Sequence, residues 1–315
     1  MRKKVANPFG NDGWTVERLG SLKGKTYLIT GANVGIGFEA AKIFVSKGAK
    51  VVILCRNAKK ANSAIQEIKQ EFKNADISFL ELDLASLSSV QKTAKIIKQN
   101  IPKIDALLCN GAIAQVEKQK LTVDGFESQL GVNYYSNFLL CGLLFEHIEK
   151  SNGRIVLVSS LGYKMGHKRI QFEDMNFDKN YHPNNVYSHS KLALMMFGYE
   201  LQRRIKSQNK NVQVHVCHPG SSKTTLIRDD APFATRMILK LIFPFFQSAQ
   251  KGACPEVLCA TENGLEDKTF YGATKRAEMV GPIGKSTLLP FVLDEKVAKR
   301  LWSISEEKVG FRWSV

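Results

Sequence analysis

Long apolar runs are missing from this sequence. No stretch approaches the ~18 uninterrupted apolar residues that a membrane-spanning helix needs. The basic start, MRKKVANPFGNDGW, is not followed by an apolar segment, so we expect no secretory signal. No linker rich in proline, glycine or serine and no internal repeat divides the chain. These absences predict a cytoplasmic protein built as one domain.

Cysteine motifs are missing as well. The six cysteines show neither CxxC nor any other spacing typical of metal ligands. Most of them fall in apolar runs, so we expect buried, reduced thiols and no metal site. They are Cys55, Cys109, Cys141, Cys217, Cys254 and Cys259.

Acidic residues are scarce relative to basic ones. The chain has 45 lysines and arginines against 29 acidic residues, a formal net charge of +16. The basic residues are spread along the chain, without a block of five or six like charges. A nucleic-acid binder would interleave basic and aromatic residues on one face, and no such pattern is present. The charge therefore points no further than to an anionic cofactor or a membrane surface.

The chain alternates short β-branched runs with longer helical patterns. Continuous apolar strands that alternate with helices indicate a parallel sheet covered on both faces, a doubly wound sheet of the Rossmann type. We expect one such domain over residues 22–315, preceded by a loosely ordered extension over 1–21. The expected strands cover 25–30, 50–55, 77–82, 104–110, 153–160 and 211–217. The expected helices cover 37–47, 61–72, 87–99, 122–149 and 186–207.

A glycine-rich stretch, TGANVGIG, follows the first expected strand. Gly31, Gly35 and Gly37 stand between that strand and a helix. Glycines in this position let the backbone approach a pyrophosphate, which the helix N-terminus then stabilises. A purely structural turn is the alternative.

The stretch VYSHSKLALMMF, residues 186–197, places Tyr187 and Lys191 four residues apart. In a helix these two side chains share one face, one turn apart. Taken alone, the pair favours two amphipathic side chains at a solvated surface over a proton-transfer device.

Together the two motifs resemble the short-chain dehydrogenase/reductase family. Its TGxxxGIG signature matches Thr30-Gly31 and Gly35-Ile36-Gly37, and its YxxxK site matches Tyr187 and Lys191. The resemblance implies a catalytic set of Asn133, Ser160, Tyr187 and Lys191. It also implies that NADP(H) or NAD(H) is held by Gly31, Asn33, Gly35, Ile36, Gly37, Asp83, Leu84, Asn110, Gly111, Ala112, Tyr187, Lys191, Pro219, Gly220 and Thr224.

Cofactor choice depends on the end of the second strand. An acid there would hold the ribose hydroxyls and repel a 2′-phosphate, but the chain has Cys55-Arg56-Asn57 instead. A guanidinium can pair bidentately with a phosphate. Arg56 therefore predicts NADPH over NADH, the alternative being an exposed charge at a strand end.

Hydride transfer to a carbonyl carbon builds negative charge on the carbonyl oxygen, so a proton donor must stand beside that oxygen. We expect Tyr187 to donate the proton, with the Lys191 ammonium lowering the phenol pKa from its usual value near ~10. Ser160 is expected to orient the substrate oxygen. In the scheme that the resemblance implies, Asn133 holds a water that relays protons to Lys191.

The segment between Ser160 and Tyr187 is 26 residues long and resembles the retinol-dehydrogenase-like branch of the family. Residues 221–247 are expected to form a flap over the substrate, with Phe233, Met237 and Phe245 in an apolar stripe. The stripe suits a bulky lipophilic ketone or aldehyde, or its alcohol, and equally a peripheral contact with a membrane.

Two other functions fit the same frame. Light-dependent protochlorophyllide reductases also carry a YxxxK site, so reduction of a carbon–carbon double bond is one alternative. A non-catalytic regulatory protein that binds NADPH is another, although Ser160, Tyr187 and Lys191 are all present. The resemblance further implies a homodimer or homotetramer through the helices that bear Asn133 and Tyr187.

Overall fold

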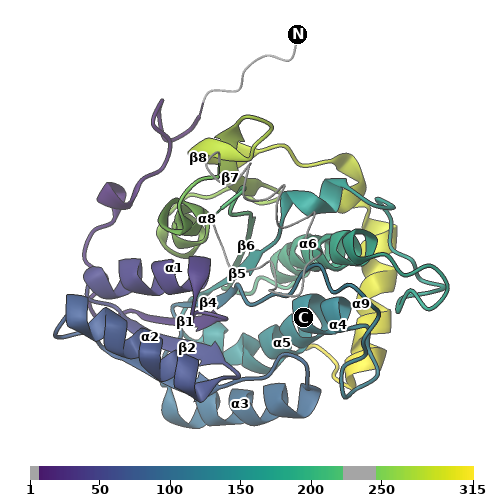
Figure 1. Cartoon of the computed structure of the whole chain (residues 1–315), viewed down its shortest axis with the longest axis horizontal. Coiled ribbons are helices and arrows are strands. Elements are labelled where there is room, and N and C mark those ends of the chain that lie inside the picture. Colours follow the sequence, from purple (N-terminus) through teal and green to yellow (C-terminus); the bar gives the residue numbers. More distant parts are fainter. Residues whose placement is uncertain (1–6, 223–245) are drawn as a thin grey trace.

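Eight strands lie side by side in one sheet within the part of the chain that the structure describes (Figure 1). The computed structural model describes residues 7–222 and 246–315. The strand order is β3-β2-β1-β4-β5-β6-β7-β8. The strands from β1 to β7 are parallel, and β8 runs antiparallel to β7. The predicted doubly wound sheet is confirmed.

The sequence predicts the first six strands but not the last two. β7 and β8 contain Gly272, Gly281, Pro282 and Gly284, which dilute the β-branched pattern of a strand. The strands are β1 (Thr26–Thr30), β2 (Lys50–Cys55), β3 (Ile77–Glu81), β4 (Ala106–Cys109), β5 (Arg154–Val158), β6 (Gln213–Cys217), β7 (Phe270–Lys275) and β8 (Val280–Ser286).

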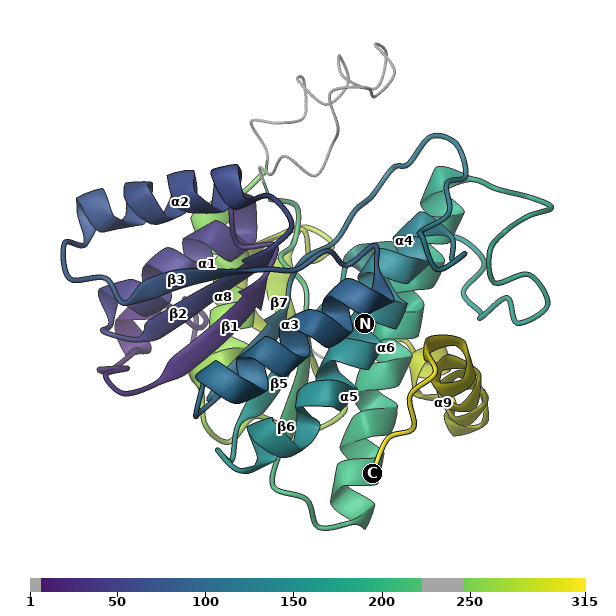
Figure 2. The same cartoon turned by 90° about the horizontal axis from the view of Figure 1, so that it is seen from below.

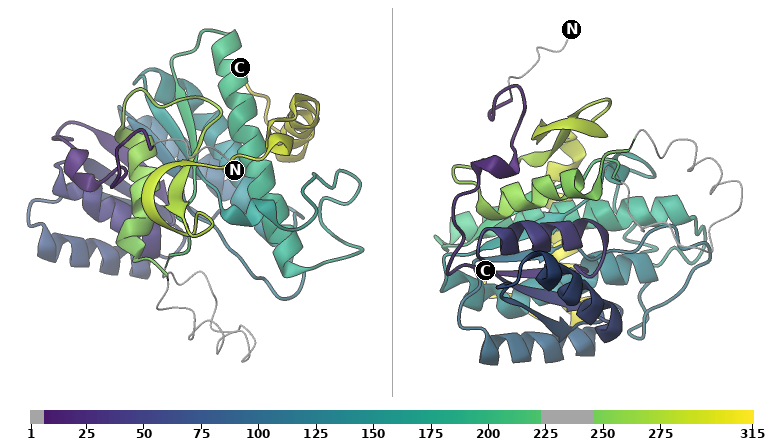
Figure 3. Two further views of the ribbon diagram at one scale, coloured as in Figure 1. Left: turned by 90° about the horizontal axis from the view of Figure 1, so that it is seen from above. Right: turned by 60° about the vertical axis from the view of Figure 1, so that its left-hand side comes forward.

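Helices cover both faces of the sheet (Figure 2 and Figure 3). One face is covered by α1 (Gly35–Ser46), α2 (Ala58–Glu71) and α8 (Ala249–Thr261). The other face is covered by α3 (Leu87–Asn100), α5 (Ser136–Glu149) and α6 (Pro183–Ser207), with α9 (Glu295–Val309) outside them. The short elements are η1 (Val16–Arg18), α4 (Ser128–Leu130), the π-helical turn η2 (Gly131–Tyr135), η3 (Leu161–Lys164) and η5 (Pro290–Leu293).

Both faces of the central strands are buried because side chains alternate along each strand. In β5, Ile155 and Leu157 belong to the core beneath α3, α5 and α6. Val156 and Val158 belong to the core beneath α1 and α8. This two-sided burial explains why the strands read as continuous apolar runs in the sequence.

The strand order reverses between β1 and β4, which are neighbours in the sheet. Chain segments that leave such neighbours run to opposite faces, and a crevice opens at the carboxyl ends of the strands. The motifs after β1, β4, β5 and β6 all lie at this edge.

The expected loose extension over residues 1–21 is wrong for its described part, 7–21. Trp14 is only 1% exposed. Its backbone N–H donates to the carbonyl of Ile283 at 2.9 Å, and its Nε1 donates to Glu262 at 2.6 Å. The segment is therefore held against β8 and the end of α8, although no regular element marks it in the sequence.

The helix expected over 122–149 begins later and is interrupted. Residues 121–127 form a turn closed by a bridge between Leu121 and Glu127. The carboxylate of Glu127 then accepts the N–H groups of Gln129 and Leu130 at 3.0 and 2.8 Å. Glu127 thus caps the N-terminus of α4. The π-helical turn η2 lies between α4 and α5.

The C-terminal helix α9 lies on α5 and α6. Trp302 is 2% exposed, and its ring centroid lies 5.2 Å from that of Phe138 and 5.8 Å from that of Phe197. The chain then places Trp313 against Trp302, with 5.0 Å between the ring centroids. A dimer that used α5 and α6 as its interface would have to displace α9.

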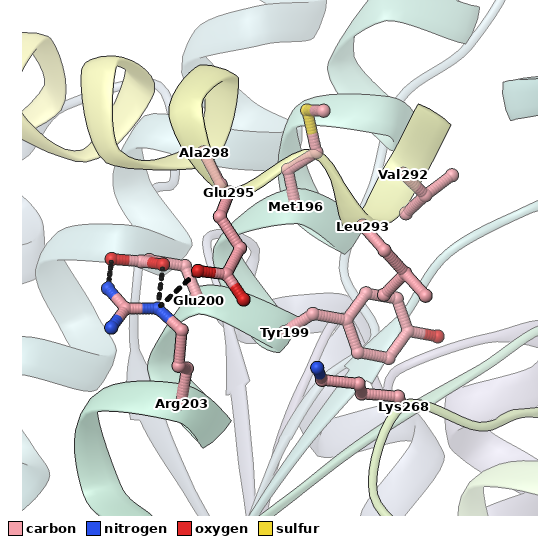
Figure 4. A pocket seen from close by; sticks show the side chains of 9 residues that line it. All are labelled: Met196, Tyr199, Glu200, Arg203, Lys268, Val292, Leu293, Glu295 and Ala298. Atoms are coloured by element: carbon pink, nitrogen blue, oxygen red, sulfur yellow. Dashed lines mark hydrogen bonds and ion pairs between the residues drawn. The ribbon is translucent and has the colours of Figure 1, made fainter. Parts of the chain in front are cut away.

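Charged groups fasten the start of α9 to α6 (Figure 4). Glu200 is buried and accepts from Arg203 and Arg204 at 2.5 and 2.8 Å. Arg203 also lies 4.0 Å from the carboxylate of Glu295, the first residue of α9. The cavity left at this junction measures about 20 Å³, enough for roughly one water molecule.

All six cysteines are buried free thiols, as the sequence predicts. Across residues 7–222 and 246–315, no helix is both long enough and apolar enough to cross a bilayer.

We expect Trp302→Ala to lower the free energy of unfolding by about 3–5 kcal/mol, because it opens a cavity among buried rings. Ser303→Ala, on the exposed side of the same helix, should change it by less than about 0.5 kcal/mol. Urea unfolding followed by circular dichroism measures both. Equal stability of the two variants would show that α9 is not an integral part of the fold.

Candidate active site

The loop after β1 adopts a conformation that suits glycine. Gly31 and Gly35 have φ of +69° and +64°. A Cβ on Gly31 would lie 2.7 Å from the Cα of Gly111, so the loops after β1 and β4 are in contact. Helix α1 begins at Gly35 without a side-chain cap from Val34. Its first N–H groups are therefore free of side-chain partners and suit a pyrophosphate.

Asn110 ties the loop after β4 to the loop after β1. Its Nδ2 donates to the carbonyl of Thr30 at 2.9 Å, and the N–H of Gly111 donates to Thr30 Oγ1 at 2.8 Å. A Cβ on Gly37 would collide with the Asn110 amide. Gly37 is thus required for close packing, and Asn110-Gly111-Ala112 fixes the edge of the sheet.

The loops after β1 and β4 together form what we call the glycine cradle. The other expected cofactor residues lie in or next to these loops. Asp83 follows β3, and its Oδ1 accepts the N–H of Ala85 at 2.9 Å. The adjacent Leu84 would be 3.0 Å from a Cβ on Gly111. Asn33 is partly buried in the first loop. Leu84 therefore lies against the loop after β4, and Asp83 directly precedes it.

Arg56 directly follows β2 and is exposed. In the described ranges its side chain has neither a hydrogen bond nor an ion pair. Asn57 caps α2 by accepting the N–H of Lys60 at 2.9 Å. The guanidinium is therefore uncommitted, and it lies beside a helix N-terminus, which also favours an anion.

Ser160 and Tyr187 come together although they are far apart in sequence. Ser160 lies two residues after the end of β5 and accepts the N–H of Gly162 at 3.1 Å. A Cβ on Gly162 would lie 3.0 Å from Cε1 of Tyr187 and 3.3 Å from Ser160 Oγ. Gly162 is therefore needed for the close approach of the two hydroxyl groups. Sequence reasoning missed it, and the GY dipeptide after the serines was its only signal.

Lys191 is buried beneath the same edge. It is 3% exposed, and its Nζ donates to the carbonyl of Val158, the last residue of β5, at 2.9 Å. The Nζ lies 5.9 Å from the centroid of the Tyr187 ring. Burial lowers the pKa of Lys191 to about 8. The ammonium is therefore held close to its titration point.

The expected lowering of the Tyr187 pKa is wrong for the protein alone. Burial raises the pKa of Tyr187, and the hydrogen bond with Ser160 offsets this only in part. Desolvation of the phenolate is the dominant cause of this shift. The phenol is consequently neutral at pH 7 and able to donate.

Asn133 lies in the π-helical turn η2 and acts through its side chain. Its Oδ1 accepts the N–H of Ile113 at 2.9 Å, and its Nδ2 donates to the carbonyl of Ile113 at 2.9 Å and to Ser190 Oγ at 3.0 Å. Ser190 Oγ in turn donates to the carbonyl of Tyr187 at 2.8 Å. The amide is thus committed to protein groups, so a water would have to bind elsewhere on Asn133. π-helical turns occur frequently at functional sites.

The structural part played by Ser190 was missed at the sequence level. It joins the turn η2 to α6 and so fixes the position of Tyr187 relative to the loop after β4.

His218 shapes the loop after β6. Its Nδ1 accepts the N–H of Gly220 at 3.0 Å, which leaves Nε2 to donate to Ser286 Oγ at 2.8 Å. Burial lowers the pKa of His218 to about 3, so the ring stays neutral. Gly220 has a φ of +66°, and together with Pro219 it turns the chain at the edge of the cradle.

Helix α8 closes the cradle from the other side. A Cβ on Gly252 would collide with Ser222 Oγ and lie 3.4 Å from Ile36 in the glycine loop. Thr224 and nearly all of the expected flap, including its apolar stripe, lie outside the described residues.

Comparisons with known proteins identify the family of this chain. The sequence profile of the family described as short chain dehydrogenase matches residues 25–234. Human retinol dehydrogenase 12 is 35% identical over 295 residues, which cover 93% of this chain and 88% of that protein. Mouse retinol dehydrogenase 14 is 38% identical over 306 residues, with coverage of 92% and 87%.

Solved structures share the fold. An uncharacterized protein from Mycobacterium paratuberculosis superposes with a TM-score of 0.79 at 31% identity, covering 96% of this chain and all of that one. A Beutenbergia cavernae protein described as an NAD(P)-dependent gluconate 5-dehydrogenase with bound NADP has a TM-score of 0.59 at 21% identity, with coverage of 77% and 91%. The chain therefore belongs to the short-chain dehydrogenase/reductase family, in its retinol-dehydrogenase-like branch.

Proposed function

We propose that this protein is an NADPH-dependent oxidoreductase that reduces the carbonyl group of a bulky lipophilic aldehyde or ketone. One observation carries the proposal. The hydroxyl groups of Ser160 and Tyr187 and the ammonium of Lys191 meet at the edge of the sheet where the glycine cradle opens. That arrangement brings a proton donor to the place where a dinucleotide would present its nicotinamide.

Each of the three side chains has a distinct task. The bound cofactor supplies the hydride. Ser160 holds the substrate oxygen, and Tyr187 gives its phenolic proton to that oxygen as negative charge develops there. Lys191 stabilises the phenolate that remains, from a position fixed by the carbonyl of Val158.

The charge state of the phenol suits the donation of a proton to a carbonyl oxygen. Alcohol oxidation needs Tyr187 as a phenolate that accepts a proton, whereas carbonyl reduction needs it protonated. Burial raises the pKa of Tyr187 and lowers that of Lys191 to about 8. The raised pKa of Tyr187 keeps the phenol protonated at neutral pH, and Lys191 is still mostly an ammonium there.

Arg56 supports NADPH over NADH. Its uncommitted guanidinium, at the start of α2, is placed to pair with a 2′-phosphate. The neighbour from Beutenbergia cavernae is described with bound NADP.

The substrate class is supported by the relatives, several of which are named retinol dehydrogenases. A retinoid is an apolar primary alcohol or aldehyde, which agrees with the lipophilic substrate expected from the sequence. Cytoplasmic location, peripheral membrane contact and homo-oligomerisation stay predictions.

We expect Tyr187→Phe to lower turnover with apolar aldehydes by about 10²–10⁴-fold, because the proton donor is lost. Binding of NADPH should persist, since the phenol ring remains. Tyr199→Phe serves as the control: it lies on the same helix, and its hydroxyl donates to the carbonyl of Thr269 at 3.2 Å. NADPH oxidation in the presence of a panel of aldehydes and ketones measures both. If the Tyr187 variant kept parental turnover, the assigned acid would be wrong.

Arg56→Ala should weaken NADPH binding by about tenfold or more, because a charge-assisted pair with the 2′-phosphate is lost. NADH binding should not change. The matched control is Lys69→Ala, which removes one exposed positive charge further along α2. Fluorescence titration gives the four affinities. Equal loss for NADPH and NADH, or loss in the control, would remove the role given to Arg56.

Lys191→Met should abolish reduction and at the same time stabilise the cofactor-free protein at pH 7 by roughly 2–3 kcal/mol. Burial lowers the pKa of Lys191 from 10.5 to about 8, so below pH 8 the folded protein carries the full cost of the buried ammonium. Between pH 8 and 10.5 only the unfolded chain keeps the proton, and that cost falls as pH rises.

The stabilisation by Lys191→Met should therefore shrink by about 1.4 kcal/mol between pH 7 and pH 9. Urea unfolding at both pH values tests this, with the exposed Lys206→Met on the same helix as a control. A variant less stable than the parent at pH 7 would contradict the expectation.

A further inference from the structure

The loop after β6, residues 218–222, lies beside the serine of the candidate active site. β5 and β6 are parallel neighbours with Val158 opposite Cys217, so the segments that follow them leave the sheet at the same edge. Ser160 comes two residues after that pair on one strand, and His218 comes one residue after it on the other. The shape of this loop therefore bears on what can lie next to Ser160.

The strand order gives a bound dinucleotide its direction. The glycine cradle follows β1 and β4, and Arg56 follows β2, on the side of β1 that faces away from β5. A dinucleotide with its pyrophosphate at the cradle and its 2′-phosphate at Arg56 extends its other half over β4, β5 and β6. The loop after β6 then borders the nicotinamide, which is the half that reacts.

The β7–β8 hairpin holds this loop through both side-chain and backbone contacts. Nε2 of His218 donates to Ser286 Oγ in β8 at 2.8 Å. The N–H of Ser221 donates to the carbonyl of Met279, in the turn of the hairpin, at 2.7 Å. A Cβ on Gly220 would collide with that same carbonyl. The hairpin thus fixes the loop on both sides of its turn.

His218 connects the hairpin to the turn itself. Its Nδ1 accepts the N–H of Gly220 at 3.0 Å, while Nε2 donates to Ser286. The Ser286 hydroxyl donates onward to the carbonyl of Ala273 in β7 at 3.1 Å. One imidazole ring therefore bonds to the loop on one side and to both strands of the hairpin on the other.

The surroundings of this ring hold it in one orientation. His218 is 0% exposed, and its ring centroid lies 4.6 Å from that of Phe270. A Cβ on Gly272 would collide with the ring. Burial lowers the pKa of His218 to about 3, so Nδ1 keeps the lone pair that accepts the N–H of Gly220. The proton transfer described above does not use this histidine.

We propose that His218 is a positioning residue for the nicotinamide half of the cofactor. It holds the turn at Pro219–Gly220 against the β7–β8 hairpin, and the turn limits where the reactive ring can lie beside Ser160. The histidine itself touches neither cofactor nor substrate. This role rests on the proposed function.

The two halves of the cofactor should respond differently to the loss of this histidine. The adenosine half is assigned to the glycine cradle and Arg56, which His218 does not contact. The nicotinamide half depends on the turn that His218 holds. The loss should therefore appear in the affinity for whole NADPH and in turnover, whereas the affinity for the adenosine half should not change.

Isothermal titration calorimetry of the full chain with NADPH and with adenosine 2′,5′-bisphosphate tests this role, because the bisphosphate lacks the nicotinamide. We expect His218→Leu, which cannot accept the N–H of Gly220, to weaken NADPH binding by about tenfold and to leave bisphosphate binding unchanged. Turnover at saturating NADPH should fall by about tenfold or more. Parental NADPH affinity, or an equal loss for both ligands, would overturn the proposal.

Two further histidine variants separate positioning from general stability. In His218→Asn the amide oxygen can take the place of Nδ1, so NADPH affinity should return to within about threefold of the parent. His215→Leu is the matched control in the same strand: this histidine is also buried and neutral, and it pairs with Gln213 at 3.4 Å. It should change neither affinity. The same loss of NADPH affinity in the control would contradict a specific role for His218.

Ser286→Ala tests the connection without altering the ring. It removes the acceptor in β8 and keeps the histidine, and it should weaken NADPH binding by about threefold with the bisphosphate unchanged. Parental NADPH affinity in this variant would show that the loop does not depend on the hairpin and would overturn the proposal. A parent chain that binds no NADPH would overturn the proposed function as well, whereas failure of the variants alone would leave that function standing.

Discussion

The hydrogen bond from the Lys191 ammonium to the carbonyl of Val158 is the constraint on which the site depends. It fastens helix α6 to the end of strand β5 at 2.9 Å. Tyr187 sits one turn before Lys191, and Ser160 sits two residues beyond Val158. One contact thus sets the helix that carries the acid against the strand that carries the serine. The protein keeps a desolvated cation at this place although burial opposes it.

The sequence predicts the part of the fold that repeats a simple pattern. Buried parallel strands show continuous apolar runs, so the strands β1 to β6 could be placed to within a few residues. The glycine loop and the YxxxK pair could be placed at the correct edge because parallel strands present all their carboxyl ends there. β7 and β8 could not, since Gly272, Gly281 and Pro282 hide their pattern.

The sequence could not predict which distant side chains contact one another. The role of Asn133 as a connector depends on Ile113 and Ser190, which are 20 and 57 residues away. The raised pKa of Tyr187 depends on burial that only the assembled elements create. Residues 7–21 have no periodic pattern, yet Trp14 anchors them to β8 through contacts with residues near the other end of the chain. Contacts between residues so far apart in the sequence leave no local pattern from which they could be predicted.

The covering of α5 and α6 by α9 bears on assembly. Trp302 and Trp313 occupy the surface that a dimer through these helices would use. The Arg204 guanidinium closes over Trp302 at 4.1 Å from its ring centroid. Intramolecular packing of this kind supplies to one chain the apolar contacts that a partner would otherwise give.

The π-helical turn η2 has a consequence for insertions and deletions in this protein. A turn of this type holds one residue more than an α-helical turn. Deleting that residue would restore regular α-helical winding and leave the face of α5 unchanged, because the wide turn already absorbs the extra residue. Phe138 and Leu139 would stay in the core, whereas Asn133 would lose its position relative to Ile113 and Ser190. The wide turn therefore serves the placement of one amide side chain and not the packing of the helix that follows it.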